Sequence, residues 1–260
     1  MSSFWSRIVI AAVGIPLVLW LMYLGGWPLF GLALVAALIA LHELYWMTRT
    51  LRPVVLAGYL GAIATLLGAE LGGTNWALAG VFATLALAFV FKGAVGASSV
   101  GVTLLGVGWI GLGLAYALLL RDIDEHGVLA LYTVVLAVWA GDAAAYFIGL
   151  LFGRHKLAPT VSPGKTWEGL AAGTVSTIAV TFIALYKQDF LSIPESLVLG
   201  AAIAIAAPLG DLFESALKRD ADVKDSGQLL AGHGGVLDRI DALLFAWVAA
   251  YYVVAAFGQL

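Results

Sequence analysis

The chain has 260 residues and a formal net charge of −3; 62% of its residues are hydrophobic and only 11% are charged. Because soluble globular domains carry a charge on about a quarter of their residues, this composition excludes an ordinary soluble domain. It indicates an integral membrane protein. The absence of cysteine also excludes disulfides and thiolate metal ligands.

Long apolar runs without strand-like alternation predict membrane-spanning helices, since about 20 apolar residues cross a hydrocarbon core. The first run is long and lacks a small-residue cleavage site, so it is predicted to be a retained helix and not a signal peptide. The predicted fold class is an all-α polytopic membrane protein with a single integral membrane domain over residues 1–260, in which residues 1–120 form a scaffold and 128–260 carry the polar motifs. In chain order we expect nine spans, at about residues 8–24, 27–47, 54–71, 74–91, 99–119, 128–152, 168–187, 195–216 and 239–258.

The Lys and Arg residues are divided unevenly between the two sides that nine spans define. Eleven of the thirteen lie on the side of the N-terminus, and only Arg121 and Lys187 lie on the other. Since basic residues are retained on the cytoplasmic side, this asymmetry predicts a cytoplasmic N-terminus and an outside C-terminus. The polar segments 154–167 and 217–239 then face the cytoplasm, where nucleotides are found.

Asp142 is a carboxylate inside an apolar span, about ten residues and so roughly 15 Å from its inner end. A charge at such a depth costs about 2.5–3.5 kcal/mol on insertion scales, so it needs a partner, a metal ion or water. A structural ion pair or a protonated hydrogen-bond donor is the alternative. We favour a role for Asp142 in the wall of a functional cavity.

The loop Val161-Ser-Pro-Gly-Lys-Thr-Trp-Glu-Gly169 is predicted to begin a helix, with Thr166 as its cap and Glu168 in its first turn. A phosphate can bind the backbone amides there, beside Lys165. The Gly-Lys-Thr of this loop matches the end of a P-loop, but Pro159 stands at the position of the first glycine and no strand is predicted before it. The P-loop interpretation therefore fails.

Four polar residues recur near the end of the eighth span at spacings of three, four and seven, which places them on one helix face. They are Asp211, Glu214, Ser215 and Lys218. An amphipathic helix end with internal ion pairs is one interpretation of this face, and a functional surface at the cytoplasmic boundary is the other.

Clustered carboxylates repel one another unless a cation joins them, and hard divalent ions take oxygen ligands. Asp238 and Asp241 share a face at the start of the last span. We therefore expect magnesium on Asp211 and Asp238, with Asp142, Asp225 and Asp241 as further candidate ligands.

The run His233-Gly234-Gly235 is predicted to be a flexible turn whose bare backbone can approach an anion. With Lys224 and Asp225 close by in the sequence, this histidine is predicted to belong to the site. In contrast, His42 and Glu43 inside the second span are interpreted as a buried polar pair.

Two regions, residues 139–169 and 210–241, together resemble a known enzyme family. The order Ser215-x-Leu-Lys-Arg, four residues, Lys224-Asp-x-Gly, then His233-Gly-Gly-x-x-Asp-Arg-x-Asp241 is similar to the signature of phosphatidate cytidylyltransferases, also called CDP-diacylglycerol synthases. The 162–169 loop resembles their Ser-Pro-x-Lys-Thr-x-Glu-Gly segment. The chain departs from the family at Ala231, where Pro is common, and at Ala143, where Ser is frequent; neither change removes a reactive group.

The resemblance implies transfer of a cytidylyl group from CTP to phosphatidic acid in a bacterial inner membrane, giving CDP-diacylglycerol and pyrophosphate. It also implies magnesium, a second, monovalent cation and a homodimer, while no nucleic-acid partner is expected. We expect catalytic roles for Asp211, Asp238, Lys218, Lys224, Asp225 and His233, nucleotide contacts from Lys165, Ser162, Thr166, Arg219, Gly234, Gly235 and Arg239, and metal contacts from Asp211, Asp238, Asp142 and Asp241.

Two other functions stay open. A CTP-dependent lipid kinase of the polyprenol or phytol kind would transfer the γ-phosphate to an alcohol and release CDP. A secondary transporter would account for an intramembrane carboxylate and many helices, but transporters often show paired halves, whereas the charged residues here are concentrated on one side.

Overall fold

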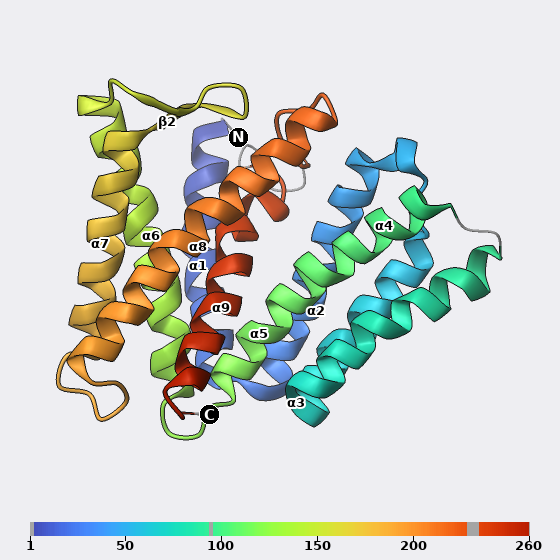
Figure 1. Ribbon diagram of the computed structural model, residues 1–260, viewed down its shortest axis with the longest axis horizontal. Helices are drawn as coiled ribbons and strands as arrows, with labels where there is room; N and C mark the ends of the chain where they lie inside the picture. The colour runs from blue at the N-terminus through green and yellow to red at the C-terminus, as the bar shows by residue number, and fades with distance from the viewer. Residues whose placement is uncertain (1–2, 94–95, 228–233, 260) are drawn as a thin grey trace. The chain divides into compact units, whose positions relative to one another are not determined.

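The computed structural model describes residues 3–93, 96–227 and 234–259, with the backbone alone for residues 3–11. Its elements in chain order are α1 (Ser3–Leu24), α2 (Gly26–Met47), η1 (Arg49–Leu51), α3 (Val55–Lys92), α4 (Ala97–Gly106), η2 (Val107–Gly111), α5 (Leu112–Arg121), α6 (Gly127–Phe152), β1 (Lys156–Ala158), β2 (Ser162–Thr166), α7 (Trp167–Leu185), α8 (Ile193–Asp220) and α9 (Leu237–Ala256) (Figure 1).

The fold is built almost entirely from helices, which confirms the predicted all-α polytopic class. Within the described part of the chain, seven helices are long and apolar enough to cross a membrane, and a shorter apolar stretch covers Ala12–Leu24. Helices suit this environment because each satisfies its own backbone hydrogen bonds without water.

Helix α3 is a hairpin of two helical halves that turn at Gly73. This glycine has φ 73° and ψ −161°, a conformation that a residue with a side chain rarely adopts. The halves pack closely on each other: Gly61 lies against Thr84, and a Cβ at Gly80 would be 2.5 Å from the backbone nitrogen of Thr65. Small residues permit such close approach of helices in lipid. The halves coincide with the predicted spans 54–71 and 74–91.

Helices α4 and α5 form one continuous helix, Ala97–Arg121, joined through the π-helical turn η2. A π turn inserts an extra residue into the helical repeat. This helix is largely buried, and Tyr45 of α2 donates its hydroxyl to the carbonyl of Thr103 at 3.0 Å.

The described chain divides into two compact units. Unit 1 comprises Met1–Asp122 and Ala221–Ile240, and unit 2 comprises Ile123–Asp220 and Asp241–Leu260. Residues 221–227 and 234–240, which carry part of the signature, therefore belong with the N-terminal helices in unit 1.

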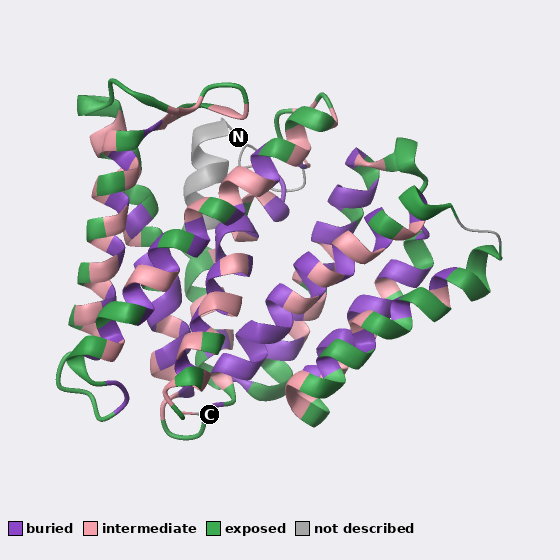
Figure 2. Ribbon diagram, viewed as in Figure 1, coloured by how far each residue is buried: buried purple, intermediate pink, exposed green. Residues whose placement is uncertain are grey.

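In unit 2, helix α7 packs along α6 through facing glycines. A Cβ at Gly169 would lie 2.6 Å from the carbonyl oxygen of Ala145, and one at Gly173 would lie 3.0 Å from that of Gly141. The outward side chains of the helices are large and apolar: Leu150 on α6 and Ile205 on α8 are more than 60% exposed. Figure 2 shows these exposed stripes beside the buried ones, the pattern expected of helices that face lipid.

A small antiparallel hairpin, β1–β2, stands between α6 and α7. Lys156 is paired with Thr166 and Ala158 with Ser162, and β2 runs directly into α7. The expectation that no strand lies here was wrong, because strands this short carry no hydrophobic alternation. The P-loop interpretation still fails, since Lys165 lies within the paired strand β2 and not in a loop between strand and helix.

Candidate active site

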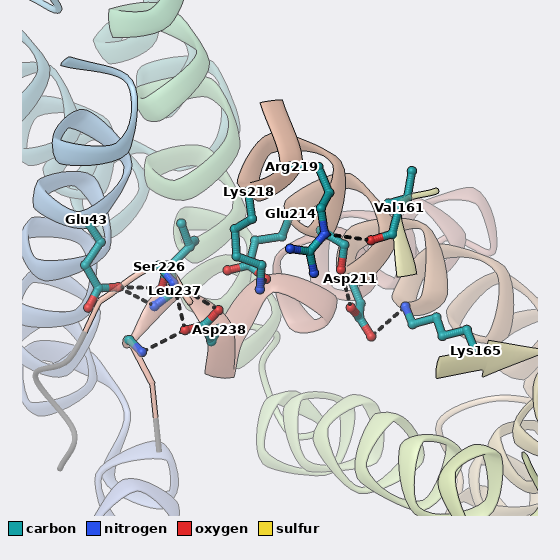
Figure 3. Close-up of polar contacts among 12 residues, drawn as sticks. Glu43, Val161, Lys165, Asp211, Glu214, Lys218, Arg219, Ser226, Leu237 and Asp238 are labelled. Carbon is teal, nitrogen blue, oxygen red and sulfur yellow. Dashed lines mark hydrogen bonds and ion pairs between the residues drawn. The ribbon is translucent and has the colours of Figure 1, made fainter. Parts of the chain in front are cut away.

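The ion pair Lys165–Asp211 joins the hairpin to helix α8 in unit 2. The Lys165 Nζ lies 2.7 Å from the Asp211 Oδ2, and the two side chains are 25% and 36% exposed. Ser215, one turn further along α8, donates its hydroxyl to Asp211 Oδ1 at 3.4 Å. Lys165, predicted to contact the nucleotide, and Asp211, predicted to bind the metal, are thus brought together although they are 46 positions apart in the sequence (Figure 3).

The C-terminal end of α8 makes two further polar contacts. Lys218 Nζ lies 2.5 Å from Glu214 Oε2, and the Glu214 side chain is 1% exposed. Arg219 donates from Nε to the carbonyl oxygen of Val161 at 3.2 Å, which gives α8 a second attachment to the hairpin (Figure 3). The predicted polar face of α8 therefore contains internal pairs and also holds the loop beside them.

Two more carboxylates lie near this ion pair in unit 2. Asp142 of α6 is exposed and within electrostatic range of Asp211 and Lys165. Asp241 of α9 is 7% exposed, and it interacts with Asp211 and with Glu214. Helices α8 and α9 are close here, since a Cβ at Gly210 would be 2.5 Å from the Asp241 carbonyl oxygen.

The donor chemistry of this cluster fits a divalent cation. The cluster combines carboxylates with two lysines: Asp142, Asp211, Glu214, Asp241, Lys165 and Lys218. Four carboxylates against two ammonium groups leave a surplus of negative charge that protons or a hard cation can balance. No three acidic or histidine side chains in the described ranges already form a metal-ligand group. The ligands would therefore have to close around an ion.

Asp238 holds the turn that precedes α9 in unit 1. Its Oδ2 accepts the backbone N–H of Gly235 at 2.7 Å and that of Ser226 at 3.1 Å. Gly234 has φ +80°, and a Cβ there would be 2.7 Å from Asp238 Oδ2. The local backbone therefore explains why residue 234 is glycine: the chain bends tightly around the carboxylate, in a conformation that other residues rarely adopt.

Glu43 of α2 binds the turn that precedes α9, a contact that the sequence did not reveal. It is 5% exposed and accepts hydrogen bonds from Ser226, Val236 and Leu237 (Figure 3). The expected buried pair of His42 with Glu43 was wrong: His42 is exposed, and its Nδ1 lies 3.2 Å from the hydroxyl of Tyr59. Adjacent residues on a helix point in different directions, so they do not face each other.

Thr166 occupies the predicted cap of α7. Its hydroxyl accepts the backbone N–H of Gly169 at 3.1 Å, and its side chain is buried, while Glu168 lies in the first turn. The predicted cap is confirmed. The nucleotide contact expected from Thr166 stays a prediction, since its hydroxyl accepts in the cap and still has an O–H to donate.

The other predicted residues lie on polar segments. Ser162 is partly exposed at the start of β2, and Gly235 is buried before α9. His233 lies outside the described residues. The exposed residues of this group are Lys224, Asp225 and Arg239.

The fold and the site define a polytopic helical membrane protein that gathers lysines and carboxylates at helix ends and a polar hairpin. A model of the cytidylyltransferase family matches residues 5–257. The chain belongs to this family.

Relatives with a known name agree with this assignment. The phosphatidate cytidylyltransferase of Bacillus subtilis (strain 168) is 33% identical over 265 residues, covering 97% of this chain and 98% of the relative. The phosphatidate cytidylyltransferase of Brucella suis biovar 1 is 33% identical over 279 residues, covering 100% and 96%. That of Haemophilus influenzae is 45% identical over 126 residues, covering 46% and 44%.

Proposed function

We propose that this protein transfers the cytidylyl group of CTP to phosphatidic acid and so makes CDP-diacylglycerol and pyrophosphate for phospholipid biosynthesis. The observation that carries the proposal is the family match over residues 5–257, together with relatives of that name that align over nearly the whole chain. The charged cluster around Lys165 and Asp211 supplies the chemistry that such a reaction needs.

The reaction needs no nucleophilic side chain. The phosphate of the lipid has a second pKa of about 6 and is largely ionised at neutral pH. A lipid phosphate oxygen attacks the α-phosphorus of CTP, the bond from that phosphorus to the β-phosphate bridging oxygen breaks, and pyrophosphate leaves. The main obstacle is the approach of two polyanions, so positioning and charge neutralisation dominate catalysis.

Basic side chains of the polar segments are proposed to bind the triphosphate and the leaving pyrophosphate. Lys165 has the strongest support for this role, because it reaches from the hairpin to Asp211 on the polar face of α8. Arg219 is attached to the same hairpin. The full proposed set is Lys165, Lys218, Arg219, Lys224 and Arg239.

Magnesium is the proposed cofactor. When bound, it would neutralise phosphate charge at the α-phosphorus. Asp211 is the ligand with the strongest support, since Asp142 and Asp241 lie within its electrostatic range. Asp238 is proposed from its place in the signature, with Asp225 as a further candidate, and a second, monovalent cation remains part of the proposal.

The membrane arrangement is proposed to comprise nine crossings, with the N-terminus in the cytoplasm and the C-terminus outside the bacterial inner membrane. The hairpin at Gly73 supports this count, because each half of α3 has about 18 residues and so spans roughly 27 Å. The uneven distribution of Lys and Arg supports a cytoplasmic active site. A homodimer is proposed from the family resemblance.

The test is incubation of the purified protein with CTP labelled in the cytosine base, phosphatidic acid and magnesium, followed by lipid extraction. Cytidylyl transfer places the label in the lipid fraction and releases pyrophosphate. A lipid kinase would leave the base in water-soluble CDP, and it would instead transfer label from γ-labelled CTP to a polyprenol or phytol. Solute uptake into proteoliposomes with no lipid product would identify a transporter, and either result would refute the proposal.

A further inference from the structure

Glu43 is the acidic residue of the largely apolar helix α2, and the residue is 5% exposed. A buried carboxylate in a membrane helix is costly unless its oxygens are satisfied. All the hydrogen bonds to this carboxylate that we observe in the described part of the chain come from Ser226, Val236 and Leu237, about 190 positions away. The N-terminal helices therefore hold the signature segment at this residue.

Three donors converge on the Glu43 carboxylate. The backbone N–H of Val236 donates to Oε1 at 3.0 Å, that of Leu237 donates to Oε2 at 2.8 Å, and the Ser226 hydroxyl donates to Oε2 at 3.3 Å. The two amides stand at the start of α9, where the first N–H groups have no acceptor within their own helix. A carboxylate at a helix N-terminus is favoured by the helix dipole and by charge-assisted hydrogen bonds.

Two glycines of the segment make this contact sterically specific. A Cβ at Gly227 would lie 2.5 Å from Glu43 Oε1, and a Cβ at Gly235 would lie 2.5 Å from Oε2. Real Cβ atoms essentially never approach a heavy atom so closely. Glycine therefore lets the backbone approach the carboxylate this closely, and a larger residue at either position would displace the Glu43 side chain from its donors.

The same contacts connect Glu43 to Asp238. Ser226 is held on two sides, because its N–H donates to Asp238 Oδ2 at 3.1 Å and its hydroxyl donates to Glu43. Gly235, whose N–H also donates to Asp238, directly precedes Val236, whose amide donates to Glu43. Two donors to the Asp238 carboxylate thus lie in or next to residues that Glu43 holds.

We propose that Glu43 is a positioning residue for nucleotidyl transfer: by holding Ser226 and the turn at residues 234–237, it presents Asp238 for catalysis. This inference rests on the proposed function. It assigns to the N-terminal helices, which carry no recognisable motif, a direct part in shaping the site.

The test compares Glu43→Gln with Glu70→Gln, each purified in the same detergent as the unaltered protein. Gln keeps the size of Glu, but its amide nitrogen would face a backbone N–H and its charge is lost. Glu70 is a matched control, because it is an acidic residue in a membrane helix of the same unit and lies near the turn at Gly26. The first readout is hydrogen–deuterium exchange of peptides covering residues 234–240, and the second is a magnesium titration of activity per folded protein.

We expect Glu43→Gln to exchange at least tenfold faster over residues 234–240 and to need about 10- to 100-fold more magnesium for half-maximal activity, as outer partners of metal ligands commonly do. Glu70→Gln should change neither readout, and Glu43→Asp, which restores the charge, should recover part of both.

If the Glu43→Gln protein exchanged at the same rate as the unaltered protein, the proposal would be overturned. The proposal would also be overturned if Glu43→Gln lost activity only in proportion to its loss of folded protein and needed the same magnesium concentration for half-maximal activity. If the unaltered protein makes no CDP-diacylglycerol, the proposed function fails, whereas the exchange experiment still decides whether Glu43 holds the segment.

Discussion

The substitution Gly210→Ala tests whether the close approach of α8 and α9 is needed for turnover. The added methyl group would lie 2.5 Å from the Asp241 carbonyl oxygen and 3.2 Å from the Ala242 Cα. Ordinary contact begins near 3.4 Å, so the two backbones must separate by about 0.9 Å, because backbone atoms cannot rotate aside as a side chain can. The neighbouring Asp211 and Asp241 carboxylates would move apart with them.

A displacement of about 1 Å can reduce a reaction rate about 100-fold, so we expect kcat to fall by about 10- to 100-fold. Overpacking costs about 1–3 kcal/mol, whereas alanine improves helix propensity by about 1 kcal/mol. The loss of stability should therefore be at most about 2 kcal/mol. Turnover should suffer far more than folding does.

The assay measures kcat per folded protein, together with thermal unfolding in detergent. Gly101→Ala is the matched control, since Gly101 is also helical but has nothing within 4 Å of its would-be Cβ. This control should gain slightly in stability and keep its turnover. If Gly210→Ala turned over within twofold of the unaltered protein and melted like the control, the argument for a close-packed site at α8 and α9 would be refuted.

Three further substitutions test single contacts. Lys165→Met removes a charge-assisted hydrogen bond of a kind worth about 1.5–3 kcal/mol, so the KM for CTP should rise about 10- to 100-fold. The control Lys156→Met, on the same hairpin, should leave this KM unchanged. If the two variants had the same KM for CTP, the role of Lys165 would be contradicted. Asp211→Asn should lower kcat and raise the magnesium requirement, and unaltered turnover throughout a magnesium titration would remove Asp211 from the proposed ligands. Thr166→Ala should destabilise α7 by about 1 kcal/mol in thermal unfolding, while Thr166→Ser should retain most of the cap. Identical melting of the two Thr166 variants would show that the cap contributes nothing.

The sequence was sufficient for the helices and for contacts within one helix. Apolar length alone located the spans, because lipid requires every backbone group in it to be satisfied inside the segment. The cap at Thr166 and the pairing of Glu214 with Lys218 followed from fixed local spacings of three and four residues. Such contacts can be predicted from sequence because the two residues that make them belong to the same or adjacent helical turns.

Contacts between residues far apart in the sequence could not be predicted from the sequence. The partners of Glu43 are 183 to 194 positions away, and no period or motif in one sequence connects them. The β1–β2 hairpin was also missed, since Pro163 and Gly164 are typical of turns and its short strands are polar. Asp142 was expected to need partners, but only the fold shows that Lys165 and Asp211 lie within its electrostatic range.

The position of Glu43 also affects how the chain is made. Its partners Ser226, Val236 and Leu237 follow 183 to 194 residues later, which at about 5–20 residues per second is roughly 10–40 s of synthesis. A charge near the end of a membrane helix costs less than the roughly 3 kcal/mol of a mid-membrane charge, and Glu43 lies near the end of α2. The Leu, Ile, Phe and Val side chains of α2 each favour insertion by about 0.3–0.6 kcal/mol and together offset this cost. Until the signature segment has been synthesised, the Glu43 carboxylate lacks these three donors, and unit 1 is complete only afterwards.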